Sequence, residues 1–483
     1  MSAVEDRIRA GALAASGAYS ADDIARAAEV VALVEAEGIE TVRTVLADPH
    51  GILRGKTITA EALTDAFASG IRVPSTLLLK DVSHRTVFPV WSDAGGAPMS
   101  GASDLLLAPL PDTFRRLPWS PHSALIHCDV AATSGEPVSF ASRQVLRAAC
   151  DRLSARGMRA VMGLEVEFQV FEVTDPALEH ADTTMPGRPP ATRALNQGYQ
   201  YLTETRYGEN EALLDKLRRN AQAMGMPVRS VEIEMGPSQF EFTFAAGDPM
   251  TIADMAVNFR TMAKKVCHRE GLLASFMARP RLPNAASNGW HIHQSLADAN
   301  GRNLFTPGAD GALTPEADGW IAGLLRHAAA SCIATTPTVN GYKRYTAYLL
   351  APDRIGWAED NRGAMLRTLL APGDPASRVE NRVPDSTANP YFALAFQILS
   401  GLDGLENRLA APPPLSRPYD DEDAERLPAS LLAAIEHFEA SGMYRDALGD
   451  GFVSYLARLK RAEWDRYLST VSEWEQAEYF TAF

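Results

Sequence analysis

The chain has 483 residues, of which 46% are hydrophobic and 22% are charged, and its formal net charge is −14. This composition describes a globular protein that can bury a large core and divide into about two or more domains. The negative charge disfavours non-specific binding to nucleic acid or to an anionic membrane, since both need basic patches, so small molecules are the better class of partner.

The N-terminal sequence shows no charged-then-apolar leader, and residues 1–19 are expected to be a mobile segment that precedes a helix cap. No apolar run of about 18 residues occurs in the chain, and we expect a soluble, cytoplasmic protein. The cysteines are far apart in mostly apolar or helical contexts, which disfavours a zinc site or a disulfide framework. We expect all of them to be reduced: Cys128, Cys150, Cys267 and Cys332.

A helix is predicted over residues 20–40, with Ser20 or Asp22 as its N-cap. Two strands joined by a turn at residues 48–51 follow, and short strands over 105–130 complete a small α/β unit. A long amphipathic helix that starts at about Ser142 opens the large domain. We therefore place one domain at 20–135 and a second at 136–483.

Loops rich in Gly, Pro and Ser are expected at residues 93–103, 180–198 and 411–418. The middle loop interrupts a set of charged strands and can fold over the site that they form. The last loop precedes a helical C-terminal region.

Four segments, at 160–171, 231–244, 289–296 and 377–383, alternate polar and apolar residues. Positions two apart share a face of a strand, so in the first segment Glu165 and Glu167 lie opposite Leu164 and Val166. The polar faces of the other segments carry Glu232, Glu234, Glu241, His291, His293, Ser295, Arg378, Glu380 and Arg382.

Any single segment of this kind is typical of a sheet with one solvated face. A solvated face normally mixes lysine with its acids, and lysine is absent from all four segments. Carboxylates that repel one another on a shared surface need cations, and oxygen-rich sites select magnesium or manganese. Taken together, the four segments indicate a divalent-cation site.

The same region carries an ordered set of motifs. They are Glu-x-Glu at 165–167, Glu-x6-Glu at 234–241 around Gly-Pro-Ser-Gln, Asn-Gly-Trp-His-x-His-Gln-Ser at 288–295, Asn-Gly-Tyr-Lys-Arg at 340–344, Asn-Arg at 361–362 and Arg-Val-Glu-x-Arg-x-Pro-Asp from 378. The set resembles the glutamine synthetase family. Each motif alone is weak, but the ordered set is highly specific, and the resemblance extends from the N-terminal hairpin to Trp474 and Glu475.

The resemblance implies an α+β fold, with an N-terminal β-grasp domain packed against a catalytic domain. The catalytic domain would be built on a curved antiparallel sheet, a half-barrel, flanked by helices. It also implies a homo-oligomer of stacked rings, a dodecamer, with active sites between subunits.

By similarity, two or three Mg²⁺ or Mn²⁺ ions would bind in the site. One ion would be held near the substrate by Glu167, Glu234 and Glu241, and a second at the ATP phosphates by Glu165, His291 and Glu380. The alternative for His291 is a structural position in the core, and the resemblance makes this alternative less favoured than a metal ligand.

The resemblance also assigns the ATP and glutamate contacts. His293 and Ser295 would lie beside ATP, with Arg362, Arg367 and Arg378 against its phosphates. Arg344 and Arg382 would bind a carboxylate of glutamate, a task that suits a planar guanidinium, and Arg362 would join them as a catalytic residue. A surface ion pair is the alternative for any one arginine, above all for Arg362. Glu167, Gly289 and Leu350 would complete the substrate site.

The activity implied is ATP-dependent ligation of L-glutamate. Phosphoryl transfer gives γ-glutamyl phosphate, and an amine then attacks its acyl carbon. Family members that use ammonia carry a glutamate six residues after Lys-Arg, where this chain has Leu350. A second ammonium-binding acid, expected from the neighbouring subunit, is also missing, since the matching region is ASGIRVPSTLLLKD at 68–81. The usual Asn-Gly-Ser-Gly is changed to Ala-Ser-Asn-Gly at 286–289.

A pocket of Leu350, Tyr348 and their neighbours would desolvate ammonium at a cost of several kcal/mol. We therefore predict a glutamate–amine ligase of amine catabolism whose acceptor is a bulky primary amine, aromatic such as an aniline, or alkyl. The alternatives are a γ-glutamylpolyamine or ethanolamine synthetase, a glutamine synthetase with an unrecognised base, and a non-catalytic relative. The extra charges of a polyamine would need acidic partners, which disfavours that acceptor.

Overall fold

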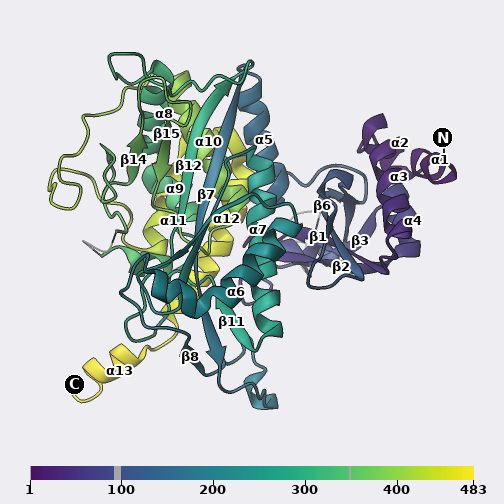
Figure 1. Cartoon of the computed structure of the whole chain (residues 1–483), viewed down its shortest axis with the longest axis horizontal. Helices are drawn as coiled ribbons and strands as arrows, with labels where there is room; N and C mark the ends of the chain where they lie inside the picture. Colours follow the sequence, from purple (N-terminus) through teal and green to yellow (C-terminus); the bar gives the residue numbers. More distant parts are fainter. Residues whose placement is uncertain (1, 92–98, 347–349) are drawn as a thin grey trace.

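The computed structural model in Figure 1 describes residues 2–91, 99–346 and 350–483, and within these ranges it contains two sheets. The smaller sheet, of six strands, has the order β2-β1-β6-β4-β3, with β5 on β6 and with β1 and β6 parallel. Its strands are β1 (Thr41–Ala47), β2 (Leu53–Thr59), β3 (Ile71–Pro74), β4 (Asp104–Pro109), β5 (Arg115–Arg116) and β6 (Ser123–Ala132).

Helices cover this small sheet, which lies to the right in Figure 1. They are α1 (Ala3–Arg9), α2 (Ala12–Ala15), α3 (Ala21–Ala36) and α4 (Leu63–Ser69). The expectation of a mobile N-terminal segment was wrong, because Ile8 and Leu13 are buried in the same cluster as Ile24 of α3. Ser20, not Asp22, caps α3, and its hydroxyl accepts from the backbone N–H of Asp23.

The larger sheet has nine strands in the order β13-β14-β15-β12-β7-β10-β9, with β8 and β11 also paired to β7. They are β7 (Met158–Val173), β8 (Thr192–Ala194), β9 (Val228–Ile233), β10 (Gln239–Phe244), β11 (Leu272–Ser275), β12 (Trp290–Asp298), β13 (Trp357–Glu359), β14 (Leu366–Leu369) and β15 (Arg378–Asn381). The pairs are antiparallel except β13 with β14. The predicted α+β class, with a β-grasp unit and a curved sheet, is confirmed.

The apolar face of the large sheet is the core, as the alternation predicts. Leu164, Val166 and Phe168 are buried, and the centroid of the Phe168 ring lies 5.7 Å from that of Phe259, in helix α7 (Pro249–Arg269). The helices of this domain are α5 (Ser142–Ser154), α6 (Glu204–Ala223), α7 (Pro249–Arg269), α8 (Pro315–Arg326), α9 (Ala328–Thr335), α10 (Pro390–Glu406), α11 (Leu431–Ala440), α12 (Gly442–Leu468) and α13 (Glu473–Tyr479). Helices on the apolar face leave the charged face free to form a cavity.

The predicted loops have mixed outcomes. Residues 411–418 contain no helix or strand, as expected, whereas 180–198 include a short helix and strand β8. Of the loop predicted at 93–103, residues 93–98 lie outside the described part of the chain.

All the cysteines are free thiols. Among the helices that the structure describes, none has the length and apolar character needed to span a bilayer.

Candidate active site

The strand ladder brings the predicted acids and histidines onto one face. His291 of β12 pairs with Glu165 of β7, and Glu241 of β10 pairs with Glu167 of β7. Residues directly opposite in a ladder have side chains about 5 Å apart, so these positions meet. On the next strand, Glu380 of β15 pairs with His293.

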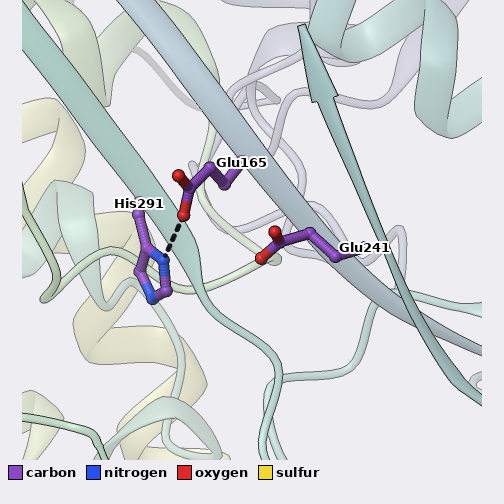
Figure 2. A group of neighbouring side chains, drawn as sticks. All are labelled: Glu165, Glu241 and His291. Atoms are coloured by element: carbon purple, nitrogen blue, oxygen red, sulfur yellow. Dashed lines mark hydrogen bonds and ion pairs between the residues drawn. The ribbon is translucent and has the colours of Figure 1, made fainter. Parts of the chain in front are cut away.

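Glu165 is the centre of this arrangement. Its carboxylate accepts from His291 Nδ1 at 2.9 Å and from His293 Nε2 at 2.8 Å. Figure 2 shows Glu165, Glu241 and His291 converging from three strands. Burial alone would raise the pKa of Glu165, but the two imidazoles hold that pKa well below its usual range.

Glu380 is fully buried and lies between two guanidinium groups. It accepts from Arg382 and, at 3.1 Å, from Arg367 Nη1, and His291 Nδ1 lies 3.6 Å away. Burial opposes ionisation, yet the neighbouring His291 and Arg382 lower the pKa of Glu380. Glu380 is therefore a charged carboxylate in a closed environment.

Glu234 and Glu241 have the opposite character. Burial, followed by the charge of Glu167, raises the pKa of Glu234 to about 8 and that of Glu241 to about 11. Ligand atoms of Glu167, Glu234 and Glu241 lie within 4.8 Å of one another. A divalent cation among them would remove the repulsion that holds protons on these acids.

Two further groups have ligand atoms equally close: Glu165 with Glu241 and His291, and Glu165 with His293 and Glu380. Carboxylate oxygens and imidazoles at this spacing fit divalent cations. The sequence predicted Glu167, Glu234 and Glu241 as one set and Glu165, His291 and Glu380 as another. The geometry brings all six together and adds His293, which had been assigned to ATP alone. We call Glu165, Glu167, Glu234, Glu241 and Glu380 the carboxylate floor.

The floor, except for the fully buried Glu380, lines a cavity of about 700 Å³. Four of the predicted arginines line it: Arg344, Arg362, Arg367 and Arg382. The buried Arg344 donates from Nη1 to the Val383 carbonyl at 2.8 Å, while its Nε has no hydrogen-bond partner among the described residues. A buried donor of this kind fits a carboxylate ligand.

The remaining predicted ATP residues lie in an adjoining cavity of about 610 Å³. His293, Ser295 and Arg378 line it, and Arg378 Nε donates to His293 Nδ1 at 3.1 Å. Glu165 lines both cavities. The structure thus divides the five predicted ATP contacts between two spaces that meet at the floor.

Gly289 holds its backbone against the floor. Its N–H donates to Glu167 at 2.8 Å, and a Cβ at this position would come within 2.9 Å of His291 Nε2 and 3.0 Å of Arg344 Nη2. Glycine is needed here because any side chain would enter the site. Gln239, which the sequence reasoning quoted only within a motif, donates to Glu167 at 3.3 Å and to Asn288 Oδ1 at 2.9 Å.

Another part of the cavity is apolar, and sequence reasoning found only Leu350 there. The residues it missed are Tyr199, Tyr201, Leu202 and Met235. The only signal for Tyr199, Tyr201 and Leu202 was their place directly after the loop at 180–198, and the only signal for Met235 was its place after Glu234 in the Glu-x6-Glu motif. Tyr348, predicted beside Leu350, lies outside the described residues.

Comparisons with known proteins agree with this geometry. The family model "Glutamine synthetase, catalytic domain" matches residues 139–479. A γ-glutamylanilide synthase from Acinetobacter is 35% identical over 475 residues, covering 94% of this chain and 95% of that protein. A γ-glutamylethanolamide synthetase from Streptomyces coelicolor is 34% identical, covering 94% and 95%. A solved GmaS–ADP complex superposes with a TM-score of 0.79 at 27% identity, covering 93% of this chain and 99% of that one. The chain belongs to the glutamine synthetase family.

Proposed function

We propose that this protein is an ATP-dependent carbon–nitrogen ligase that joins the γ-carboxylate of L-glutamate to a primary organic amine. The observation that carries the proposal is the cavity itself, which combines the carboxylate floor with arginines and an apolar region. Relatives matched over 94% of the chain are named for an anilide and an ethanolamide product. A non-catalytic role is disfavoured because the predicted metal ligands are all present.

The residues have distinct tasks in this reaction. Arg344 and Arg382 bind a carboxylate of glutamate, and Arg362, Arg367 and Arg378 neutralise the phosphates of ATP, with His293 and Ser295 beside the nucleotide. Divalent cations held by the floor and His291, Mg²⁺ or Mn²⁺, would supply the charge neutralisation that phosphoryl transfer needs. Gly289 and Leu350 border the substrate space.

The chemistry proceeds in two steps. The γ-carboxylate oxygen attacks the γ-phosphorus of ATP, and ADP leaves. The amine nitrogen then attacks the acyl carbon, the carbon–oxygen bond breaks, and phosphate leaves while the nitrogen loses a proton. Exclusion of water protects the acyl phosphate between the two steps.

The acceptor is the finer part of the proposal. Leu350 offers no carboxylate where ammonia-using members carry one, and an alkylamine arrives protonated at neutral pH. An arylamine arrives neutral and needs no base to expose its lone pair. We favour a bulky or aromatic primary amine over ammonia, ethanolamine or a polyamine.

The assembly is a homo-oligomer of stacked rings in this proposal. Helix α13 projects from the body at the C-terminus (Figure 1), and its region exposes the large apolar side chains of Trp474, Phe480 and Phe483. Exposed apolar surface of this kind marks a contact between proteins. A dodecamer in the cytoplasm would bury it.

Phosphate release with ATP, glutamate and a panel of amines tests the function. We expect aniline-type and bulky alkyl amines to exceed ammonia in kcat/KM, and mass spectrometry to find the γ-glutamyl amide. Ammonia outperforming every organic amine would identify an ordinary glutamine synthetase instead.

A further inference from the structure

In the single subunit, large apolar side chains are unusually exposed where they line the catalytic cavity. They are Tyr199 at 57%, Tyr201 at 50%, Leu202 at 55%, Met235 at 40% and Leu350 at 48% exposure. Scattered exposed apolar residues need no explanation, but a contiguous set beside a reaction site does. We call these five residues the acceptor wall.

The backbone holds the aromatic part of this wall in place. The Tyr199 N–H donates to the Met235 carbonyl at 2.6 Å, and the Leu202 N–H donates to the Ile233 carbonyl at 3.1 Å. The Tyr199 hydroxyl donates to the Asn284 carbonyl at 3.1 Å. Residues 199–202 are thus anchored to the chain just before and after Glu234, so the wall and the floor have a fixed relation.

The backbone conformation of the loop indicates that this placement is specific. Tyr199 and Leu202 have φ of 64° and 56°, a left-handed conformation that large side chains rarely adopt. Such residues cost about 1 to 3 kcal/mol each and persist where surrounding contacts enforce them. The chain therefore accepts strain while presenting apolar side chains to the cavity.

Tyr201 lines the cavity together with Glu234, Glu241 and Arg362. The other ring of the wall, that of Tyr199, has its hydroxyl held by the Asn284 carbonyl. The backbone carbonyl of Arg362 accepts a 3.1 Å hydrogen bond from Arg382 Nε. An aromatic ring at this position can pack against an amine whose nitrogen reaches the glutamyl carbon.

We propose that the acceptor wall binds the ring of an aromatic amine and that Tyr201 is its main specificity-determining residue. This inference rests on the proposed function, because the wall has no task if no amine is ligated. An aromatic ring gains from packing beside the Tyr201 ring and from displacing water from the exposed leucines. Ammonia and other small nucleophiles gain nothing from the same surface.

The test compares two nucleophiles on the full-length holoenzyme: aniline, which has a ring, and hydroxylamine, which has none. Tyr201→Ala is expected to lower the ratio of kcat/KM for aniline to that for hydroxylamine about fivefold to tenfold. Tyr201→Phe keeps the ring and is expected to retain the ratio within about twofold. Leu202→Ala lowers it about threefold, while its matched control, Leu178→Ala, changes an exposed leucine outside the cavity and leaves the ratio as in the wild type.

The outcomes separate the inference from the function beneath it. A wild-type enzyme that forms γ-glutamyl hydroxamate but no anilide overturns the aromatic acceptor itself. Equal loss of both reactions in Tyr201→Ala overturns the wall alone and assigns Tyr201 a structural role. A change in oligomeric mass on Tyr201→Ala also overturns the wall, because a second subunit would then be its occupant.

Discussion

The carboxylate floor and the acceptor wall lie in one cavity but are built by opposite means. The floor comes from paired strands, and its carboxylates are buried or half-buried, with Glu165 held by His291 and His293. The wall consists of residues outside helices and strands, and its large side chains are exposed. In the proposed reaction, therefore, sheet register positions the reacting groups, while loop residues select the acceptor amine.

A substitution that removes a carboxylate from the floor and leaves the wall unchanged has the largest expected effect. Glu241→Gln keeps the volume of the side chain but removes a charged ligand from two of the close groups. We expect kcat for every amine to fall about 100-fold or more, because neutralisation of the phosphoryl-transfer site fails. Steady-state phosphate release with saturating ATP measures this.

The same variant has a second signature, in the metal-free protein. The pKa of Glu241 is raised to about 11 by burial and by Glu167, so its folded pKa lies above its unfolded value. An acid of this kind destabilises the fold progressively as pH rises above the unfolded pKa. Metal-free Glu241→Gln should therefore melt above the wild type, and by more at pH 8 than at pH 6. Lower stability at both values would contradict the assignment of Glu241 as a repelled ligand.

The second prediction introduces a carboxylate, the group that defines the floor, into the acceptor wall. Leu350→Glu places a carboxylate where ammonia-using members carry one, at a position that is half exposed. We expect the ratio of kcat/KM for ammonia to that for aniline to rise at least about tenfold, because a carboxylate stabilises ammonium and opposes an apolar ring. Leu350→Gln is the matched control, since it adds polarity without charge. An unchanged ratio in Leu350→Glu would place the acceptor nitrogen elsewhere.

A pH comparison between two amines sharpens the same contrast in the unmodified enzyme. An alkylamine has a pKa near 10, so its neutral fraction grows about tenfold for each pH unit between 7 and 9. An arylamine is already neutral over this range. The ratio of kcat/KM for isopropylamine to that for aniline should rise by about tenfold per unit, because titration of the enzyme cancels in the ratio. A flat ratio would mean that the site itself deprotonates the alkylammonium.

The floor could be predicted from the sequence because strands have a period. Positions two apart share a face, so Glu165 and Glu167 were placed opposite Leu164 and Val166 before any pairing was known. The alternation does not tell which strands pair, and for that reason His293 was not expected beside Glu380.

Apart from Leu350, the wall could not be predicted, because a loop has no period. The directions of Tyr199 and Leu202 depend on positive φ values, which local sequence does not specify. The N-terminal helices were missed for a related reason, since the burial of Ile8 depends on its contact with distant elements. Long-range packing, and not the local sequence pattern, determines both the direction of the wall side chains and the burial of the N-terminal helices.

The smallest expected effect is the increase in melting temperature on metal binding, and it distinguishes the floor from the wall most clearly. A ligand that binds only the folded protein stabilises it by about 2.7 kcal/mol at 100 times its Kd. Adding Mg²⁺ or Mn²⁺ to metal-free protein should raise the melting temperature by a few degrees, because the floor holds acids that are protonated or repelled without a cation. Tyr201→Ala should keep this increment and Glu241→Gln should lose most of it. The change in Tyr201→Ala leaves every proposed ligand in place, whereas the change in Glu241→Gln removes one. If both variants kept the full increase in melting temperature, the cations would therefore bind outside the floor.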